Sequence, residues 1–232
     1  MKWSHGKFLI AAAIPAIAAA LPGVTLAANC TNGVPNGAAT WDPTAYVSRY
    51  ATIGDGTTIA AGARVGSYAR IGTCGTIGVD SIVGGSSRLG NNVSVLNASR
   101  ISAGARIGDN TVIDNASRVG GASVIGAGVN IVNNSLLGTR TRVGDNSAID
   151  NSRFGSYAHI GIGGTVTSGY VGYSADLGDG VTVDTNSRVN RNDRVDSGVH
   201  IFNDVYIGSY VHVCQDVVAG MRLPSSKPYG CK

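Results

Sequence analysis

The sequence predicts an all-β solenoid in which very short parallel strands stack coil upon coil. An aliphatic residue returns at every sixth position from Val47 to Ile149; a one-residue slip then shifts the series to Phe154, Ile160 and Val166, and after a second slip it continues from Val171 to Val213. A helix has a period of 3.6 and a long strand a period of 2, whereas a solenoid of short strands repeats every six residues. The chain also lacks Glu and has few Lys. Both residues favour helices, so their scarcity agrees with an all-β chain.

Each six-residue repeat has an inward, an outward and a corner position. The residue two before the aliphatic one is small or β-branched, as at Thr57, Ala63 and Ala69. Residues two apart on a strand share a face, so both point inwards and the residue between them points outwards. The residue after the aliphatic one is usually Gly, Asp or Ser, as at Gly54 and Asp114. We expect the chain to turn a corner there, because these residues tolerate the dihedral angles of a turn.

These repeats resemble those of the hexapeptide-repeat family, and the resemblance covers residues 47–213. It implies a left-handed parallel β-helix with three repeats, or eighteen residues, in each triangular coil and nine to ten coils in all. The handedness is an implication of the resemblance, since it departs from the right-handed crossover rule. Coils stacked at about 4.8 Å give a prism roughly 45 Å long.

The two ends of the chain have a different composition from the repeats. Residues 1–28 combine a positively charged start, a long apolar stretch and small residues near Ala27, which is typical of a secretory signal peptide, although a membrane anchor is the alternative. No other segment is apolar enough to span a bilayer. We therefore expect a secreted, periplasmic or cell-surface protein without a membrane span after signal removal. Residues 29–46 and 214–232 are expected to form an N-terminal and a C-terminal cap.

Four cysteines in an exported chain predict two disulfides. Cys214 and Cys231 bracket the last coil and the tail, so that a bond between them would clasp the C-terminal cap. Cys30 and Cys74 would then tie the N-terminal cap to the second coil. Closing a loop of that size stabilises by about 3 kcal/mol. A reduced pair or a different pairing remains the alternative.

The outward residues of one of the three expected faces are small and uncharged. This flat face carries Thr58, Thr76, Ser94, Val112, Asn130, Ala148, Thr165, Thr182 and His200. It forms a strip of about 45 by 15 Å, near the roughly 800 Å² that one partner contributes to an ordinary interface. We expect it to contact a second copy, another protein or a repetitive surface. Its threonines also resemble part of the ranked Thr of β-helical antifreeze proteins, which leaves ice binding as an alternative.

The other two faces carry rows of arginine. One row contains Arg64, Arg100 and Arg118, and the other contains Arg70, Arg88 and Arg106. The guanidinium forks could bind an anionic polysaccharide or the phosphates of lipopolysaccharide. The alternative is a solubilising surface whose charge is balanced by residues such as Asp80 and Asp109 and by ions. Without Lys2 and Lys7 the net charge falls from +4 to +2, so nucleic-acid binding is not supported.

Histidines are the candidate catalytic or metal-binding residues. Many hexapeptide-repeat proteins are sugar or amine acyltransferases with a catalytic His between subunits of a trimer. Here His159, His200 and His212 lie in no recognisable motif, and the coils carry no long inserted loop. Related carbonic anhydrases use three His as zinc ligands, yet His159 and His212 are about 14 Å apart by coil count. We therefore expect no metal site and no cofactor.

Together these patterns predict an exported, non-catalytic structural or surface protein that uses the flat face for self-association or partner contact. Two alternatives remain open. One is a binding protein for an anionic glycan, through the arginine rows, or for ice, through the flat face. The other is a sugar acyltransferase of the hexapeptide-repeat type.

Overall fold

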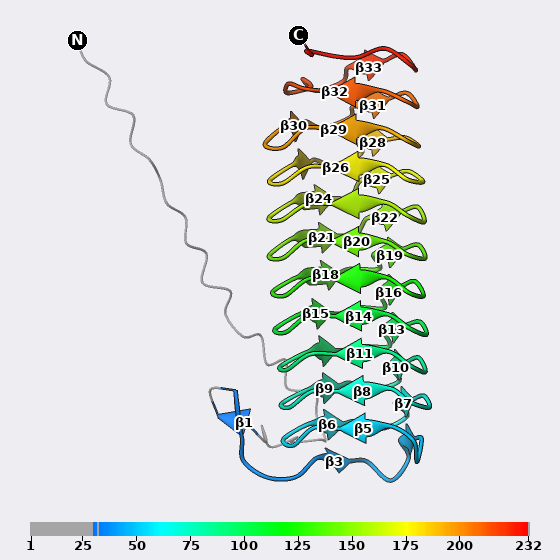
Figure 1. Cartoon of the computed structure of the whole chain (residues 1–232), viewed down its shortest axis with the longest axis vertical. Coiled ribbons are helices and arrows are strands. Elements are labelled where there is room, and N and C mark those ends of the chain that lie inside the picture. The colour runs from blue at the N-terminus through cyan, green and yellow to red at the C-terminus, as the bar shows by residue number, and fades with distance from the viewer. Residues whose placement is uncertain (1–29, 32, 232) are drawn as a thin grey trace, which may run out of the picture.

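The computed structural model describes residues 30–31 and 33–231, and the expected signal peptide lies outside the described residues. The chain forms a parallel β-solenoid of about ten coils, in which three sheets are the walls of a triangular prism (Figure 1). From β3 to β32 each strand pairs with the strand three places away in the chain, so that every coil lies directly on the previous one. The described residues contain no helix. The predicted all-β parallel solenoid is therefore confirmed.

The strands of the prism belong to three sheets, and each sheet forms one wall. Sheet 1 contains β4 (Tyr46–Val47), β7 (Arg64–Val65), β10 (Ile82–Val83), β13 (Arg100–Ile101), β16 (Arg118–Val119), β19 (Leu136–Leu137), β22 (Arg153–Phe154), β25 (Tyr170–Val171), β28 (Arg188–Val189), β31 (Tyr206–Ile207) and β33 (Arg222–Leu223). Sheet 2 contains β5 (Thr52–Ile53), β8 (Arg70–Ile71), β11 (Arg88–Leu89), β14 (Arg106–Ile107), β17 (Val124–Ile125), β20 (Arg142–Val143), β23 (His159–Ile160), β26 (Asp176–Leu177), β29 (Arg194–Val195) and β32 (His212–Val213). Sheet 3 contains β3 (Thr40–Trp41), β6 (Thr58–Ile59), β9 (Thr76–Ile77), β12 (Ser94–Val95), β15 (Val112–Ile113), β18 (Asn130–Val132), β21 (Ala148–Asp150), β24 (Thr165–Thr167), β27 (Thr182–Val183) and β30 (His200–Ile201).

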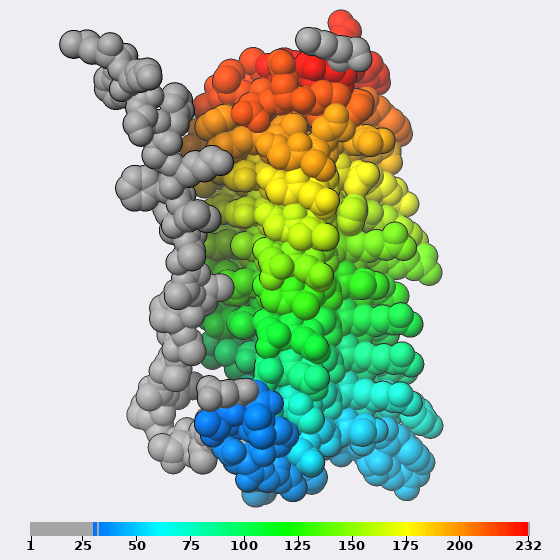
Figure 2. Space-filling view, turned by 60° about the vertical axis from the view of Figure 1, so that its left-hand side comes forward, coloured from blue at the N-terminus to red at the C-terminus, as the bar shows by residue number. Residues whose placement is uncertain are grey.

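The coil is left-handed. In Figure 1 the chain climbs from bottom to top, while the strands of sheet 2, nearest the viewer, run from right to left. The solenoid is also slightly longer than residues 47–213, because β3 pairs with β6 at one end and β33 pairs with β31 at the other. Figure 2 shows the resulting rod, with the N-terminal residues in blue at one end and the C-terminal residues in red at the other.

The core is a single column of aliphatic side chains. The periodic residues from Ile59 to Leu223 are at most 6% exposed, and Phe154 is the largest fully buried side chain. The inward positions two residues earlier hold many buried hydroxyls. Several of these hydroxyls bond to the next coil: Ser87 Oγ donates to the Ser102 carbonyl at 3.0 Å, and Thr111 Oγ1 donates to the Gly126 carbonyl at 2.9 Å, whereas Ser99 Oγ has no partner among the described residues. Inward Ser and Thr thus satisfy buried polar groups at the corners.

The glycines that follow the aliphatic residues have a different role from the one the sequence suggested. Gly54, Gly108 and Gly120 do not have a positive φ. They allow close stacking: a Cβ at Gly120 would lie 2.3 Å from the carbonyl oxygen of Gly138 in the next coil. The left-handed conformation falls two residues later instead, mainly on Asn, Ser, Ala and Gly, as at Asn110 (φ 57°). Asn adopts this conformation more readily than most residues.

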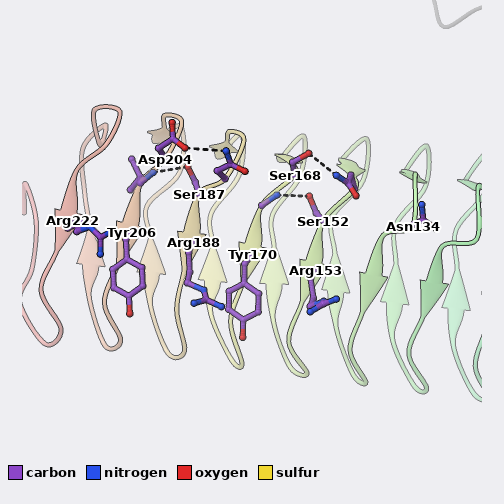
Figure 3. Close-up of a pocket in the computed structure, with 14 residues that line it drawn as sticks. Asn134, Ser152, Arg153, Ser168, Tyr170, Ser187, Arg188, Asp204, Tyr206 and Arg222 are labelled. Carbon is purple, nitrogen blue, oxygen red and sulfur yellow. Dashed lines mark hydrogen bonds between the residues drawn. The ribbon is translucent and has the colours of Figure 1, made fainter.

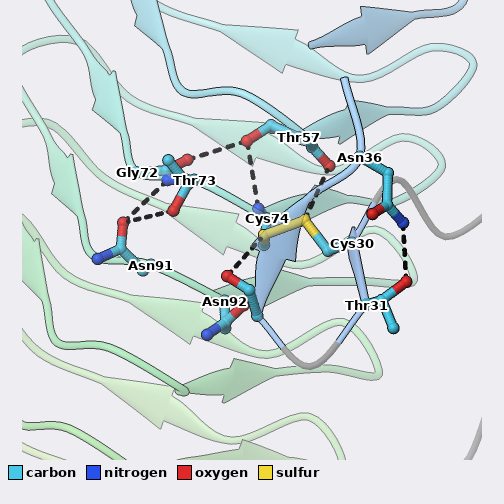
Figure 4. The surroundings of a disulfide bond; sticks show 12 residues. Cys30, Thr31, Asn36, Thr57, Gly72, Thr73, Cys74, Asn91 and Asn92 are labelled. Atoms are coloured by element: carbon cyan, nitrogen blue, oxygen red, sulfur yellow. Dashed lines mark hydrogen bonds between the residues drawn. A yellow bond between two sulfur atoms is a disulfide. The ribbon is translucent and has the colours of Figure 1, made fainter. Parts of the chain in front are cut away.

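Disulfides close both ends, and the predicted pairing is confirmed. The Cα atoms of Cys30 and Cys74 are 5.7 Å apart, and those of Cys214 and Cys231 are 5.0 Å apart. The first bond holds an antiparallel hairpin, β1 (Cys30–Thr31) with β2 (Val34–Pro35), against the corner between sheets 2 and 3 (Figure 4). The hairpin therefore lies along this corner, where Gly33 is close to Asn92 two coils beyond Gly56.

Two coils in the interior of the solenoid are one residue shorter than the eighteen-residue coils on either side of them. Arg153 pairs with Leu136 and with Tyr170 in sheet 1, which are separations of seventeen residues in place of eighteen. Each shortened coil lacks one residue at the corner between sheets 3 and 1. The shortened connections are Asn151–Ser152 and Ser168–Gly169. The inward positions Gly164 and Gly169, which lack side chains, lie in the same part of the prism as Phe154.

One ionisable group lies inside the prism. Asp193 occupies an inward position and is 1% exposed; its Oδ1 accepts a hydrogen bond from Val211 N at 2.8 Å and its Oδ2 accepts one from Asn190 N at 2.7 Å. Burial raises the pKa of Asp193 from 3.8 to about 6, and this effect outweighs the backbone hydrogen bonds that lower the pKa.

The buried carboxyl group predicts a pH-dependent stability. The folded chain keeps the proton up to a higher pH than the unfolded chain, so this contribution is fully present below about pH 4 and is lost as pH rises through about 6. We expect Asp193 to lower the free energy of unfolding by about 3 kcal/mol over that interval. Asp193→Asn should be less stable at low pH, since one amide cannot accept both N–H groups, and should lack this pH dependence. Denaturant unfolding of the wild type and of Asp193→Asn from pH 4 to 7.5 measures both effects. If the free energy of unfolding changed equally with pH in the two proteins, the raised pKa would not belong to Asp193.

Candidate functional site

Charge is segregated around the cross-section of the prism. Every arginine of the chain lies on sheet 1, on sheet 2 or at the corner between them. All aspartates except Asp176 and Asp193 lie on the opposite side, which is sheet 3 with its two bordering corners. The net charge of the chain is only +4, so the segregation does not follow from a large excess of one sign. We call the two regions the basic side and the acidic side.

Most aspartates of the acidic side form hydrogen bonds within the protein. Asp109 Oδ1 accepts a hydrogen bond from Asn91 N at 2.7 Å, and Asp145 Oδ1 accepts one from Ala127 N at 2.8 Å. At the other corner Asp114 Oδ1 accepts from Asn97 Nδ2 at 2.7 Å. Each bond joins one coil to the next. A carboxylate on a short side chain reaches these corner amides directly, which gives a physical reason for Asp and no Glu.

The arginines of the basic side are exposed and have few partners. Among the described residues, the only arginine in an ion pair is Arg194, whose Nε lies 3.6 Å from Asp196 Oδ1. The structure places Arg70, Arg88 and Arg106 on three consecutive strands of sheet 2, as expected. Arg100 and Arg118 are neighbours on sheet 1, and Arg64 is separated from them by Ile82. All six side chains are exposed.

Sequence reasoning missed the corner between sheets 1 and 2, because it considered only the outward strand positions. This corner carries pairs of arginine and tyrosine. Arg49 and Arg140 each donate a hydrogen bond to a tyrosine hydroxyl, of Tyr50 and Tyr157 respectively. The corner tyrosines are also exposed and include a stacked pair, Tyr50 and Tyr68, with ring centroids 5.3 Å apart. Extending the eighteen-residue register to the turn positions would have found these residues.

A groove runs along sheet 1 in the C-terminal half of the prism, with a volume of about 740 Å³. Its floor row alternates strictly between two residue types on successive coils: Arg153, Tyr170, Arg188, Tyr206 and Arg222 (Figure 3). Its rim is the corner between sheets 3 and 1, with Asn134, Asn151, Ser168, Asn186 and Asp204. Asp204 is held by Asn186, whose Nδ2 donates to Asp204 Oδ1 at 3.2 Å. The two shortened connections lie in the middle of this rim.

The flat face lies on sheet 3, as the register requires. Thr76, Ser94, Asn130, Thr165 and Thr182 occupy successive or near-successive outward positions and are half-buried. Thr58 is only 5% exposed, so its side chain is not available to a partner. Val112 and Ala148 interrupt the row of hydroxyl and amide groups. Both borders of the face carry the aspartates of the acidic side.

Each of the three described candidate histidines has a carboxylate partner, which the sequence did not indicate. His159 Nδ1 lies 2.6 Å from Asp176 Oδ1, His200 Nε2 lies 2.7 Å from Asp184 Oδ2, and His212 Nε2 lies 2.8 Å from Asp196 Oδ1. The partners belong to adjacent coils, so a search for a local motif could not find them. The His159–Asp176 pair borders a second hollow of about 620 Å³, which Arg140, Arg142 and Tyr157 also line.

Among the described residues, one cluster has the ligand types and spacing of a metal site, namely His212, Cys214 and Cys231. The two cysteines form a disulfide, which leaves His212 without thiolate ligands beside it. No helix in the described part of the chain has the length and hydropathy that a bilayer span requires.

No protein-family model matches the chain, and no curated protein matches it. Solved structures do match. They include UDP-N-acetylglucosamine acyltransferases from Campylobacter jejuni (16% identity over 79% of this chain and 70% of that one, TM-score 0.42) and Arabidopsis (16%, 81% and 72%, TM-score 0.40). The Francisella novicida enzyme matches with 16% identity and a TM-score of 0.38, and the match covers 79% of this chain but only 62% of that enzyme. At such identities the likeness concerns the fold alone. The assignment of a hexapeptide-repeat β-helix rests on the coils and strand registers of this chain.

Proposed function

We propose that this protein is an exported, non-catalytic β-helix that binds an anionic polysaccharide along its basic side. The observation that carries the proposal is the segregation of every arginine onto two walls and one corner, away from nearly all carboxylates. A surface that only keeps a protein soluble intersperses both signs. Two disulfides favour an oxidising compartment, where extracellular and cell-surface polysaccharides occur.

The spacing of the arginines suits a linear polymer. Adjacent coils place Arg70, Arg88 and Arg106 about 4.8 Å apart, where like charges repel by about 1 kcal/mol per pair even in water. A polyanion lying along the prism would replace this repulsion by attraction. Arginine also suits carboxylate and sulfate groups better than lysine does, because its planar fork binds two oxygens at once.

Titration with polygalacturonate and with its carboxyl-reduced, neutral counterpart tests the proposal. We expect binding of the acidic polymer alone, and an affinity that falls steeply between low and physiological ionic strength because the contacts are exposed charges. Binding that ignores salt, or equal binding of the neutral polymer, would refute an electrostatic polysaccharide site. The molar mass of the free protein should be measured alongside the titration.

Self-association through the flat face has less physical support than the sequence suggested. If two copies packed sheet 3 against sheet 3, their aspartate-bearing corners would face each other and repel. We therefore expect the mature protein to be monomeric in low salt by size exclusion with light scattering. A dimer that strengthens as salt rises would indicate that the flat face overcomes this repulsion.

Sugar acyl transfer is the second candidate, and one observation favours it. The His159–Asp176 pair lies beside Arg140 and Arg142, which is an arrangement of an oriented base next to cationic groups. Incubation with an acyl-thioester donor and a panel of amino sugars, followed by thiol release, tests this activity. Turnover that His159→Asn abolishes would establish it; thiol release no faster than that from buffer would exclude it for those donors.

A further inference from the structure

We propose that the groove on sheet 1 binds a polysaccharide segment whose sugars alternate between acidic and neutral. This inference rests on the proposed function and names the ligand class and the part of the basic side that selects it. The alternation of Arg153, Tyr170, Arg188, Tyr206 and Arg222 on successive strands carries it.

The spacing of the row suits a disaccharide repeat. Arg153, Arg188 and Arg222 lie two coils apart, or about 10 Å. An extended β-linked disaccharide has nearly this length, and one coil corresponds to one pyranose ring. A chain lying along the groove would therefore present a carboxylate to every arginine and a neutral sugar to every tyrosine. A polymer with a carboxylate on each sugar would instead place alternate charges over tyrosines.

The tyrosines also hold the arginines in place. The Arg188 guanidinium lies over the Tyr170 ring, 4.5 Å from its centroid, and that of Arg222 lies 5.8 Å from the centroid of Tyr206. Stacking on a ring uses the face of the guanidinium and leaves its N–H edge free for two hydrogen bonds to a carboxylate. The tyrosine hydroxyls remain to bond neutral sugar hydroxyls.

The rim supplies neutral hydrogen-bonding groups opposite this row. Three rim residues with a positive φ line the groove, namely Asn134 (61°), Asn151 (45°) and Ser168 (47°). Their short side chains leave room for a sugar ring at the two shortened connections. Asp204 lies at the C-terminal part of the rim and is bonded to Asn186, so the three arginines keep the groove positive overall.

Calorimetric titration with three hexasaccharides tests the inference: hyaluronan (alternating glucuronate and N-acetylglucosamine), oligogalacturonate (every sugar acidic) and cellohexaose (neutral). We expect the hyaluronan fragment to bind at least tenfold more tightly than the other two. Tyr170→Ala and Arg188→Ser should each weaken that binding by tenfold or more. Tyr46→Ala, which changes an exposed tyrosine of the same sheet outside the groove, is the matched control and should leave it unchanged.

The outcomes separate this inference from the proposed function. If oligogalacturonate binds as tightly as hyaluronan, or if the groove variants bind hyaluronan like the wild type, the inference is wrong while polyanion binding stands. If long acidic polymers also fail to bind, the proposed function fails as well. All substitutions affect exposed or half-buried outward side chains, so circular dichroism and thermal unfolding should show unchanged folds.

Discussion

Replacing Arg70, Arg88 and Arg106 together by serine is expected to abolish retention of the protein on an immobilised acidic polysaccharide at physiological salt. The three side chains are neighbours on β8, β11 and β14, are exposed, and have no ion-pair partner among the described residues. Each contact between a guanidinium and a carboxylate contributes about 1 kcal/mol in water, so losing three weakens binding about a hundredfold. Elution salt on a polygalacturonate column measures the effect.

Two controls make this result interpretable. Arg70→Lys, Arg88→Lys and Arg106→Lys in combination keep the charge but lose the planar fork, so we expect retention to be reduced and not lost. Thr76→Ser with Thr165→Ser and Thr182→Ser changes the opposite wall and should elute like the wild type. The serine variant should fold at least as stably as the wild type, because like charges have been separated. Unchanged elution of a folded serine variant would contradict a role of sheet 2 in binding.

Phe154→Ala is expected to destabilise the protein by about 3–5 kcal/mol, the largest effect we expect from one substitution in the core. Phe154 is the largest fully buried side chain and lies in a shortened coil. The parallel ladders on both sides limit collapse around the cavity. The free energy of unfolding in denaturant measures the loss.

Phe202→Ala is the matched control. Phe202 lies at a corner, is only half-buried and stacks on His200 with ring centroids 3.8 Å apart, so we expect a loss of about 1 kcal/mol. Phe154→Leu keeps most of the volume and should cost less than about 1.5 kcal/mol. If Phe154→Ala unfolds at the same denaturant concentration as Phe202→Ala, the packing described for the shortened coils is wrong.

The sequence predicted the fold because a solenoid is nearly one-dimensional. Strand neighbours of an outward residue lie one coil, usually eighteen positions, away, so the register alone assigned Arg88 between Arg70 and Arg106 and placed Thr76 on another wall. The disulfide pairing followed from the position of Cys214 and Cys231 on either side of the last coil, which left Cys30 to pair with Cys74, whereas the N-terminal hairpin that carries Cys30 was not predicted. The role of glycine at Gly120 was predicted wrongly, because close stacking of backbones depends on three-dimensional separation and not on local dihedral preference.

The candidate site was only partly predictable. The repeat register places Arg153, Tyr170, Arg188 and Tyr206 on the same face as Arg64, Arg100 and Arg118, but Arg222 lay beyond the expected end of the solenoid. The two one-residue slips of the sequence series fall between Ile149 and Phe154 and between Val166 and Val171, and the structure places both at the corner between sheets 3 and 1. The His159–Asp176 pair was missed, since its members are seventeen residues apart and share no motif.

The most direct test of the central claim is a chemical footprint of the protein with bound polygalacturonate. Arginines are modified with phenylglyoxal, backbone amides are followed by hydrogen exchange, and the rates are read peptide by peptide by mass spectrometry. We predict slower modification of Arg88, Arg106 and Arg188 in the complex and unchanged exchange around Asp55 and Asp80 on the acidic side. Free reaction of the arginines together with protection of the sheet 3 side would contradict the assignment of the basic side as the binding surface.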